Sequence, residues 1–274
     1  MTATTVSMNE IAPTAQAGLI LEPLLNESIS TAAAVSTTHT TGATEFRVPI
    51  VAEDAIAAWT REGEEITPTE VTLDELTITP RKVAGLIPVS RELAEDSSPD
   101  ASAIIGNSLA RSLVYQLDAA FLGALPAPAP QGLGSLEATE ITTSLTNLDA
   151  VLEGKAAIGI AGGTATAIIA HPNDALALSK LKDAEGSNRS LIDDVSTVAS
   201  LPVIQTQHAT EGELWIVDNT AIHTVVREDV SVTSSSDVYF SSDRVAIRAT
   251  ARVDFGFPYQ NRLVKITTNA DTGS

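Results

Sequence analysis

Apolar and polar residues alternate along the segment EITPTEVTLDELTITPRK, which spans residues 65–82. The apolar positions are Val71 and Leu73, then Leu76 and Ile78, so the phase of the alternation slips by one residue between the two pairs. A period of two predicts a β-strand with one covered face. The slip predicts a bulge or a bend within that strand.

Similar patterns predict strands elsewhere. Residues 46–51 form a strand that leads into this segment, so the two make a long hairpin. Residues 83–89 (VAGLIPV) are almost all apolar, which is typical of a strand buried on both faces. Near the carboxyl terminus, residues 245–253 alternate throughout, and residues 261–267 form another strand.

The clearest helical pattern begins at Ser98-Pro99-Asp100. A serine can cap a helix, proline fits the first helical position, and an aspartate fits the positive end of the helix dipole. Gly123 and Pro126 then end the helix. Its apolar residues recur at steps of four and are Ile105, Leu109, Leu113, Leu117 and Phe121.

Residues 136–230 are predicted to form an α/β unit. Helices are expected at residues 145–157 and 172–182, and strands at residues 166–170, 203–206, 214–217 and 223–226. A shorter helix is expected near the amino terminus, over residues 18–29.

The composition is that of an acidic globular protein. The 274 residues are 43% hydrophobic and carry 35 acidic against 16 basic side chains, a formal net charge of −19. Because phosphate contacts need clustered lysine and arginine, this balance argues against a dedicated nucleic-acid binder. The absence of cysteine fits a reducing cytosol, and no signal-peptide or membrane-spanning pattern is present.

The charge is distributed unevenly along the chain. Between residues 61 and 75 the only base is Arg61, and the acids are Glu62, Glu64, Glu65, Glu70, Asp74 and Glu75. Residues 239–265 carry the opposite balance, with the bases Arg244, Arg248, Arg252, Arg262 and Lys265 against Asp243 and Asp254. Arg248 and Arg252 lie four residues apart and therefore share one face of their strand.

An acidic hairpin with little core of its own and a basic strand elsewhere suggest a contact between copies of the chain. The alternatives are a salt-bridge network within one chain, or two unrelated solvated faces. The expected inter-subunit contact residues are Glu62, Glu64, Glu65, Glu70, Val71, Leu73, Leu76, Ile78, Arg244, Arg248, Arg252 and Arg262.

The sequence carries no recognisable catalytic, cofactor or metal motif. The glycines of GIAGGTATA, residues 159–167, lack the Lys-Ser/Thr of a phosphate-binding loop and precede a strand. His39, His171, His208 and His223 show no metal-ligand spacing. No G-x-S-x-G elbow is present either, so we expect no enzyme activity, cofactor or metal.

The order of the elements is similar to that of the major capsid proteins of tailed bacteriophages, which have the Hong Kong 97-type fold. The residues that carry the resemblance are Trp59…Glu62-Gly63, Leu76…Thr79-Pro80-Arg81-Lys82, Val89-Ser90-Arg91-Glu92-Leu93, Asp96-Ser97 and the segments LKDAEGSNRSLI (181–192) and VDNTAIHTVVRED (217–229). The resemblance covers roughly residues 11–267 and implies an α+β fold.

The resemblance also implies a division into segments. These are an amino-terminal arm with a short helix (1–45), an extended β-hairpin loop (46–84), a first part of the peripheral domain with the long spine helix (85–135), an axial domain (136–230), and carboxyl-terminal strands of the peripheral domain (231–274).

The function implied is that of a major capsid protein. Copies would assemble in the bacterial host cytoplasm into hexamers and pentamers of an icosahedral virion shell, with the extended loop over a neighbour's peripheral domain. The shell would enclose double-stranded DNA without sequence-specific binding, with a portal and a decoration protein as further partners and no membrane. The alternatives are an encapsulin shell around a cargo enzyme, and an enzyme with an unrecognised site.

Two further expectations concern assembly. The arm-like sequence begins within about fifteen residues of Met1, so either scaffolding is a separate protein or this sequence is an already processed or trimmed form, and Met1 favours the first. Some capsids of this family join a loop lysine to a neighbour's asparagine. Asn261 could supply the amide, but no lysine lies between Thr60 and Thr79, so a non-covalent shell is expected.

Overall fold

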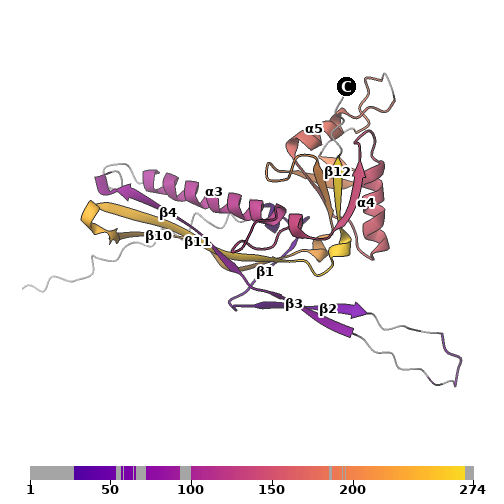
Figure 1. Cartoon of the computed structure of the whole chain (residues 1–274), viewed down its shortest axis with the longest axis horizontal. Helices are drawn as coiled ribbons and strands as arrows, with labels where there is room; N and C mark the ends of the chain where they lie inside the picture. Colours follow the sequence, from indigo (N-terminus) through magenta and orange to yellow (C-terminus); the bar gives the residue numbers. More distant parts are fainter. Residues whose placement is uncertain are drawn as a thin grey trace, which may run out of the picture.

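The computed structural model describes residues 28–53, 57, 59–63, 65, 72–92, 100–184, 187–192, 194 and 196–268. The strands in these ranges form a four-stranded sheet, a six-stranded sheet and a two-stranded hairpin. In Figure 1 the four-stranded sheet and a long helix extend to one side, the six-stranded sheet stands at the other end, and the hairpin projects away from both. The predicted α+β class is confirmed.

The four-stranded sheet has the order β1-β10-β11-β4. Strand β1 (Thr37–Thr40) is parallel to β10 (His223–Tyr239), which is antiparallel to β11 (Arg244–Gly256). Strand β11 is antiparallel to β4 (Arg81–Ser90), which is one edge of the sheet. The sheet therefore joins residues near both ends of the chain.

Helix α3 (Asp100–Leu122) covers one face of this sheet. The predicted stripe is confirmed, because Leu109, Leu113, Leu117 and Phe121 are buried, and each side chain of this size contributes about 1.5–3 kcal/mol relative to exposure. The helix ends at Leu122, as predicted from Gly123 and Pro126. The predicted caps, Ser98 and Pro99, lie outside the described residues.

Strand β4 differs from the prediction in its burial. Its even-numbered residues are exposed, whereas Val83, Gly85, Ile87 and Val89 are covered to different degrees by α3. The expectation of a strand buried on both faces is therefore wrong. The strand is apolar on both faces, but only the face beneath α3 is covered. The other face is exposed in the described part of the chain.

The six-stranded sheet has the order β5-β12-β9-β6-β8-β7. Its strands are β5 (Thr139–Thr143), β12 (Leu263–Thr268), β9 (Glu213–Val217), β6 (Ala167–Ala170), β8 (Leu201–Gln205) and β7 (Thr197–Val198). Strand β12 pairs with β9 and β5 near the middle of the chain. The carboxyl-terminal segment predicted for the peripheral domain, residues 231–274, therefore divides between the two sheets, with β11 in the four-stranded sheet and β12 in the six-stranded one.

Two helices pack on one face of the six-stranded sheet. They are α4 (Asp149–Ile160) and α5 (Pro172–Lys180), both predicted from the sequence with slightly different ends. Val151, Ile158 and Leu178 from the helices share a buried cluster with Ile168 and Ile216 from the strands. Short 3-10 turns complete the described chain: η1 (Ile29–Thr31), η2 (Leu133–Ser135), η3 (Asn219–Ala221), η4 (Phe240–Ser242) and η5 (Gln260–Arg262).

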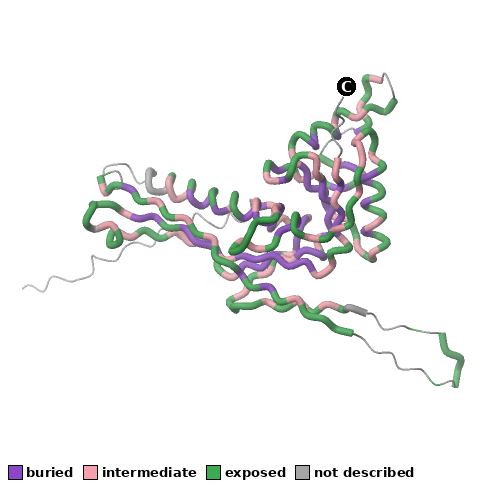
Figure 2. The backbone as a smooth tube through the Cα atoms, viewed as in Figure 1, coloured by how far each residue is buried: buried purple, intermediate pink, exposed green. Residues whose placement is uncertain are grey.

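A single core joins the two sheets. The opposite face of the six-stranded sheet, including Ile169 and Trp215, packs with Phe121 of α3 and Phe255 of β11. The two phenyl rings meet edge to face with centroids 5.0 Å apart. In Figure 2 the buried residues form a continuous band from one sheet into the other.

The chain enters this core through a buried polar contact. Asp118 of α3 accepts hydrogen bonds from the Ser28 hydroxyl at 2.6 Å and from the Ile29 amide at 3.0 Å. Burial raises the pKa of Asp118, and the bonds to Ser28 and Ile29 act in the opposite direction. The helix predicted over residues 18–29 lies outside the described residues except near its end, where η1 begins at Ile29.

The hairpin consists of β2 (Phe46–Glu53) and β3 (Thr72–Ile78). Its register runs without interruption from Phe46 opposite Ile78 to Val51 opposite Leu73. The expectation of a bulge between Leu73 and Leu76 is therefore wrong, and the register shift lies instead between Val51 and Glu53. The slipped pattern arises because Leu73 and Leu76 point to opposite faces of the hairpin.

Candidate functional site

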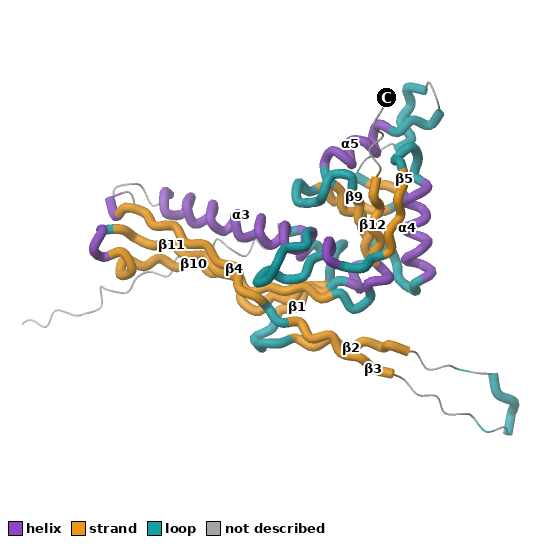
Figure 3. The backbone as a smooth tube through the Cα atoms, viewed as in Figure 1, coloured by secondary structure: helices purple, strands orange, loops and turns teal. Residues whose placement is uncertain are grey.

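The hairpin surface is acidic and largely exposed. Figure 3 shows that the hairpin ends in a turn far from both sheets, and Figure 2 shows exposed residues along most of its length. Of the predicted acidic contact residues, Glu62 and Glu65 are exposed, whereas Glu64 and Glu70 lie outside the described residues. Glu75 is partly engaged within the hairpin, by an ion pair with Arg47 at 3.2 Å.

The apolar residues of the hairpin divide between two faces. Leu73 is 68% exposed and lies opposite the exposed Val51, so the described part of the chain leaves this pair largely uncovered. Ile78 is only 2% exposed, and a side chain at Gly256 would collide with Ile78 and make a tight contact with Leu76. We expected Val71, Leu73, Leu76 and Ile78 all to lack a covering surface within their own chain. This is wrong for Ile78 and Leu76, which pack on the sheet at Gly256. Val71 lies outside the described residues.

The root of the hairpin packs on the face of the four-stranded sheet that is opposite α3. Ile78 lies over Gly256, and His39 of β1 stacks on Phe46 with ring centroids 4.8 Å apart. These contacts fix where the hairpin leaves the sheet, and its outer half projects away from both sheets (Figure 1).

The predicted basic strand is β11, and its arginine side chains lie on the same face of the sheet as the hairpin root. Arg244, Arg248 and Arg252 lie on this face because their positions alternate with residues buried beneath α3. Arg248 is exposed and lies opposite Leu86, which is 51% exposed. Arg252 donates to Glu228 at 3.1 Å, so for this residue the within-chain ion pair is present.

Arg262 does not belong to this surface. It lies in η5, where its Nε donates to the Ala161 carbonyl at 3.3 Å and its guanidinium stacks 4.4 Å from the Tyr259 ring centroid. The η5 turn carries the chain from β11 into β12, and thus from one sheet to the other. The structure therefore brings Arg244, Arg248 and Arg252 together and separates Arg262 from them.

A histidine pair at the hairpin root was not predicted. The Nε2 of His39 and the Nδ1 of His223 lie 2.9 Å apart, and β1 and β10 bring these residues together across 184 positions of sequence. Asp254 lies nearby on the same face, and its Oδ2 forms an ion pair with the Nε of Arg81 at 3.9 Å. Burial, and next the charge of His39, lower the pKa of His223.

The histidine pair predicts a loss of stability in weak acid. The unfolded His223, with its ordinary pKa of about 6.5, binds a proton more readily than the folded one. The contribution of this residue is thus complete above pH 6.5 and falls as the pH drops below that value. We expect the change in urea midpoint from pH 7.5 to pH 5.5 to be more unfavourable for the unaltered protein than for His223→Gln.

The His223→Gln variant is needed as a reference because three buried carboxylates also change stability as the pH falls. Burial raises the pKa values of Asp118, Asp174 and Asp254, so these groups favour the folded state as the pH falls. Their effect is common to both proteins and cancels in the difference. Equal midpoint drops for the two proteins would contradict the assignment to His223.

Within the described ranges, no three histidine or acidic side chains are arranged to hold a metal ion. None of the helices there is long and apolar enough to cross a lipid bilayer. The candidate site therefore has two parts. One is the acidic, largely exposed β2–β3 hairpin, and the other is the basic face of β11 with Arg244, Arg248 and Arg252.

The architecture is that of phage capsid proteins of the Hong Kong 97 type. The chain superposes on a solved structure from Mycobacterium phage Cain with a TM-score of 0.75 at 17% identity, covering 98% of this chain and 96% of that one. For the capsid of a native GTA particle the TM-score is 0.73 at 18% identity, covering 96% and 100%. For Mycobacterium phage Adephagia it is 0.74 at 17%, covering 89% and 91%.

The sequence agrees with the fold. The model of the phage capsid family matches residues 11–268, so the chain belongs to that family. It is also 25% identical over 211 residues to the capsid polyprotein of Pseudomonas phage PAJU2, a match that covers 72% of this chain. The matched region spans only 30% of that polyprotein.

Proposed function

We propose that this chain is the major capsid protein of a tailed double-stranded DNA bacteriophage. Copies would form hexamers and pentamers that close into an icosahedral shell, assembled in the host cytoplasm and located in the virion. The observation that carries the proposal is the projecting hairpin of a phage capsid family member, on which Leu73 and Val51 are exposed among the residues that the structure describes. Exposed apolar surface of this kind marks an interaction site.

The charge distribution supports the same proposal. The acidic hairpin of one copy would lie over the basic face of β11 in a neighbour, where Arg248 is exposed. Each exposed ion pair contributes only about 0–1 kcal/mol. Such pairs would therefore determine register and partner choice more than strength.

The role proposed is structural, not catalytic. A net charge of −19 keeps the wall from binding its genome tightly, so the shell would enclose DNA without reading its sequence. The further partners in this proposal are a portal, a separate scaffolding protein and a decoration protein.

Assembly of the expressed protein tests the proposal. Size-exclusion chromatography and negative-stain microscopy should show capsomers or closed shells. A concentrated 28.5 kDa monomer that never associates would contradict it. Particles that enclose an enzyme and never nucleic acid would favour a cargo compartment of the same fold instead.

The shell is expected to hold together without covalent crosslinks. An attacking lysine must be neutral and must lie beside the amide. The five lysines are Lys82, Lys155, Lys180, Lys182 and Lys265, and Lys82 lies on β4 beyond the root of the hairpin. Arg61 cannot replace lysine because a guanidinium stays protonated.

Denaturing electrophoresis checks this prediction. Mature particles boiled in detergent should give one band near the mass of the single chain. A ladder of oligomers that survives both boiling and reductant would show that another lysine reaches an amide in the assembled shell.

A further inference from the structure

The turn at the far end of the hairpin carries a fully exposed tryptophan. Trp59 has a relative exposure of 106%, and the exposed acids Glu62 and Glu65 follow it. The only other tryptophan, Trp215, is buried in the core between the sheets. A tryptophan is costly to leave in water, and tryptophans that become buried at the centre of an interface are among its strongest contributors.

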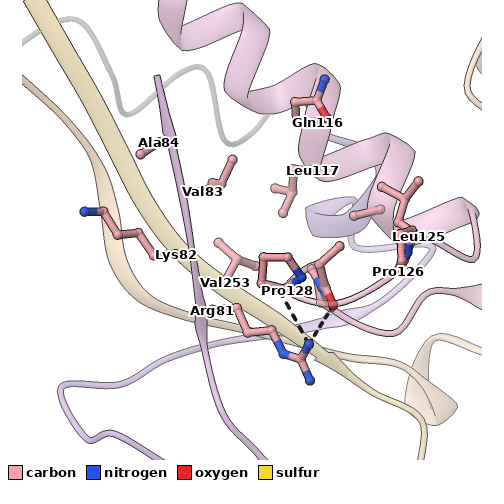
Figure 4. A pocket seen from close by; sticks show the side chains of 13 residues that line it. Arg81, Lys82, Val83, Ala84, Gln116, Leu117, Leu125, Pro126, Pro128 and Val253 are labelled. Atoms are coloured by element: carbon pink, nitrogen blue, oxygen red, sulfur yellow. Dashed lines mark hydrogen bonds between the residues drawn. The ribbon is translucent and has the colours of Figure 1, made fainter. Parts of the chain in front are cut away.

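An apolar pocket of about 460 Å³ lies beside the start of β4. Figure 4 shows that its walls come from β4, from α3 and from the proline-rich segment 125–130, with Val83, Leu117 and Pro128 among the lining residues. This volume is within the range of about 300–1,000 Å³ that is usual for ligand sites. The pocket is therefore large enough for an indole ring.

The proline-rich wall is held in place by specific contacts. Arg81 Nη1 donates to the carbonyl of Ala129 at 2.7 Å and more weakly to that of Pro128 at 3.4 Å (Figure 4). Further along, Gly132 lies so close to the end of α3 that a side chain there would collide with the carbonyls of Ala120 and Gly123. The pocket is thus formed before any ligand arrives.

We propose that Trp59 of one copy inserts into this pocket of a neighbouring copy. The inference rests on the proposed assembly function and names an anchor for the hairpin. Trp59 cannot fill the pocket of its own chain, because the hairpin leaves the sheet near the pocket and carries its turn away from it (Figures 1 and 3).

Charge and topology favour this occupant. The exposed Lys82 and the Arg81 guanidinium lie at the pocket. The described turn carries Glu62 and Glu65 against one base, Arg61, so its acidic excess is opposite in charge to the pocket rim. Strand β4 is an edge of its sheet, and an incoming hairpin would cover this edge. Prolines and a cation also suit an aromatic ring, which packs on apolar walls and attracts a positive charge to its face.

Fluorescence of assembled particles tests the insertion. In a Trp215→Phe background Trp59 is the only tryptophan. Its emission in particles should lie at short wavelength, with acrylamide quenching several-fold weaker than for a solvated indole. Particles that form normally but leave Trp59 fully quenchable would overturn the inference and leave the proposed function intact. Failure of the unaltered protein to form particles would instead count against the proposed function.

A variant that fills the pocket provides a second test of the insertion. Ala129→Phe in the same background should either reduce particle yield or leave Trp59 in particles with solvent-like emission. Particles of Ala129→Phe in which Trp59 is as protected as before would show that the tryptophan occupies another site, and would overturn the proposal.

Engineered disulfides locate the contact directly, because the chain has no native cysteine. Oxidised particles of Trp59→Cys/Ala129→Cys should give a ladder of oligomers that collapses on reduction. The matched control is Trp59→Cys/Ala156→Cys, with the second cysteine exposed on α4 in the six-stranded part, and it should stay monomeric. A ladder from the control and none from the test pair would contradict the assignment.

Discussion

Replacing Phe121 by alanine is expected to lower the free energy of unfolding by about 3–5 kcal/mol. The side chain is fully buried and meets Phe255 edge to face. Its removal takes away the transfer energy of the ring and leaves a cavity between the two sheets, which the surrounding strands cannot fill without losing their pairing. Because this core joins the sheets, the variant should also assemble poorly.

The matched control lies on the same helix. Ile104 is 62% exposed, and Ile104→Ala should change the free energy of unfolding by no more than about 0.5 kcal/mol. Urea unfolding of dissociated subunits, followed by circular dichroism, measures both. Similar losses in the two variants would mean that the core between the sheets contributes less than its burial indicates.

Reversing the charge of the hairpin is expected to stop assembly. We consider Glu64, Glu65 and Glu70 changed together to lysine, three changes of two units each, so that the net charge moves from −19 to −13. The hairpin would then face the basic strand β11 of a neighbour with like charge at each of many repeated contacts. Like charges placed against each other cost several kcal/mol per interface, far more than a lost surface pair.

Two further variants show whether assembly depends on the pairing of the hairpin with β11 or only on the net charge of the chain. Reversing the exposed acids Glu137, Asp183 and Asp237 to lysine changes the net charge by the same amount away from the hairpin, and particles should still form. Adding Arg248→Glu to the hairpin variant should restore part of the particle yield, as measured by sedimentation. Normal assembly of the hairpin variant would refute the pairing with β11.

The local pattern of the sequence determined the secondary structure well. The stripe of α3 and the alternation of β11 were read correctly because both depend on the periodicity of one element against one covering face. The acid-rich hairpin and the shared face of Arg248 and Arg252 were predicted for the same reason. A resemblance in the order of elements then indicated the capsid family.

Only the tertiary structure decided which elements meet. The place of β12 in the six-stranded sheet and the separation of Arg262 from β11 depend on a turn at η5, for which the local alternation gives no signal. The register of the hairpin was misread because an apolar slip can mean a bulge or residues on two faces, and only the pairing with β2 distinguishes them.

The same limit applies to the sites that the sequence did not reveal. His39 and His223 lie 184 residues apart, and the pocket is assembled from β4, α3 and the proline-rich segment. Periodicity reports which face of an element is covered, but not by what, because the covering partner is chosen by packing across the whole chain. The sequence by itself therefore determined the elements and their exposed charges, and the packed fold decided which of these residues form a surface together.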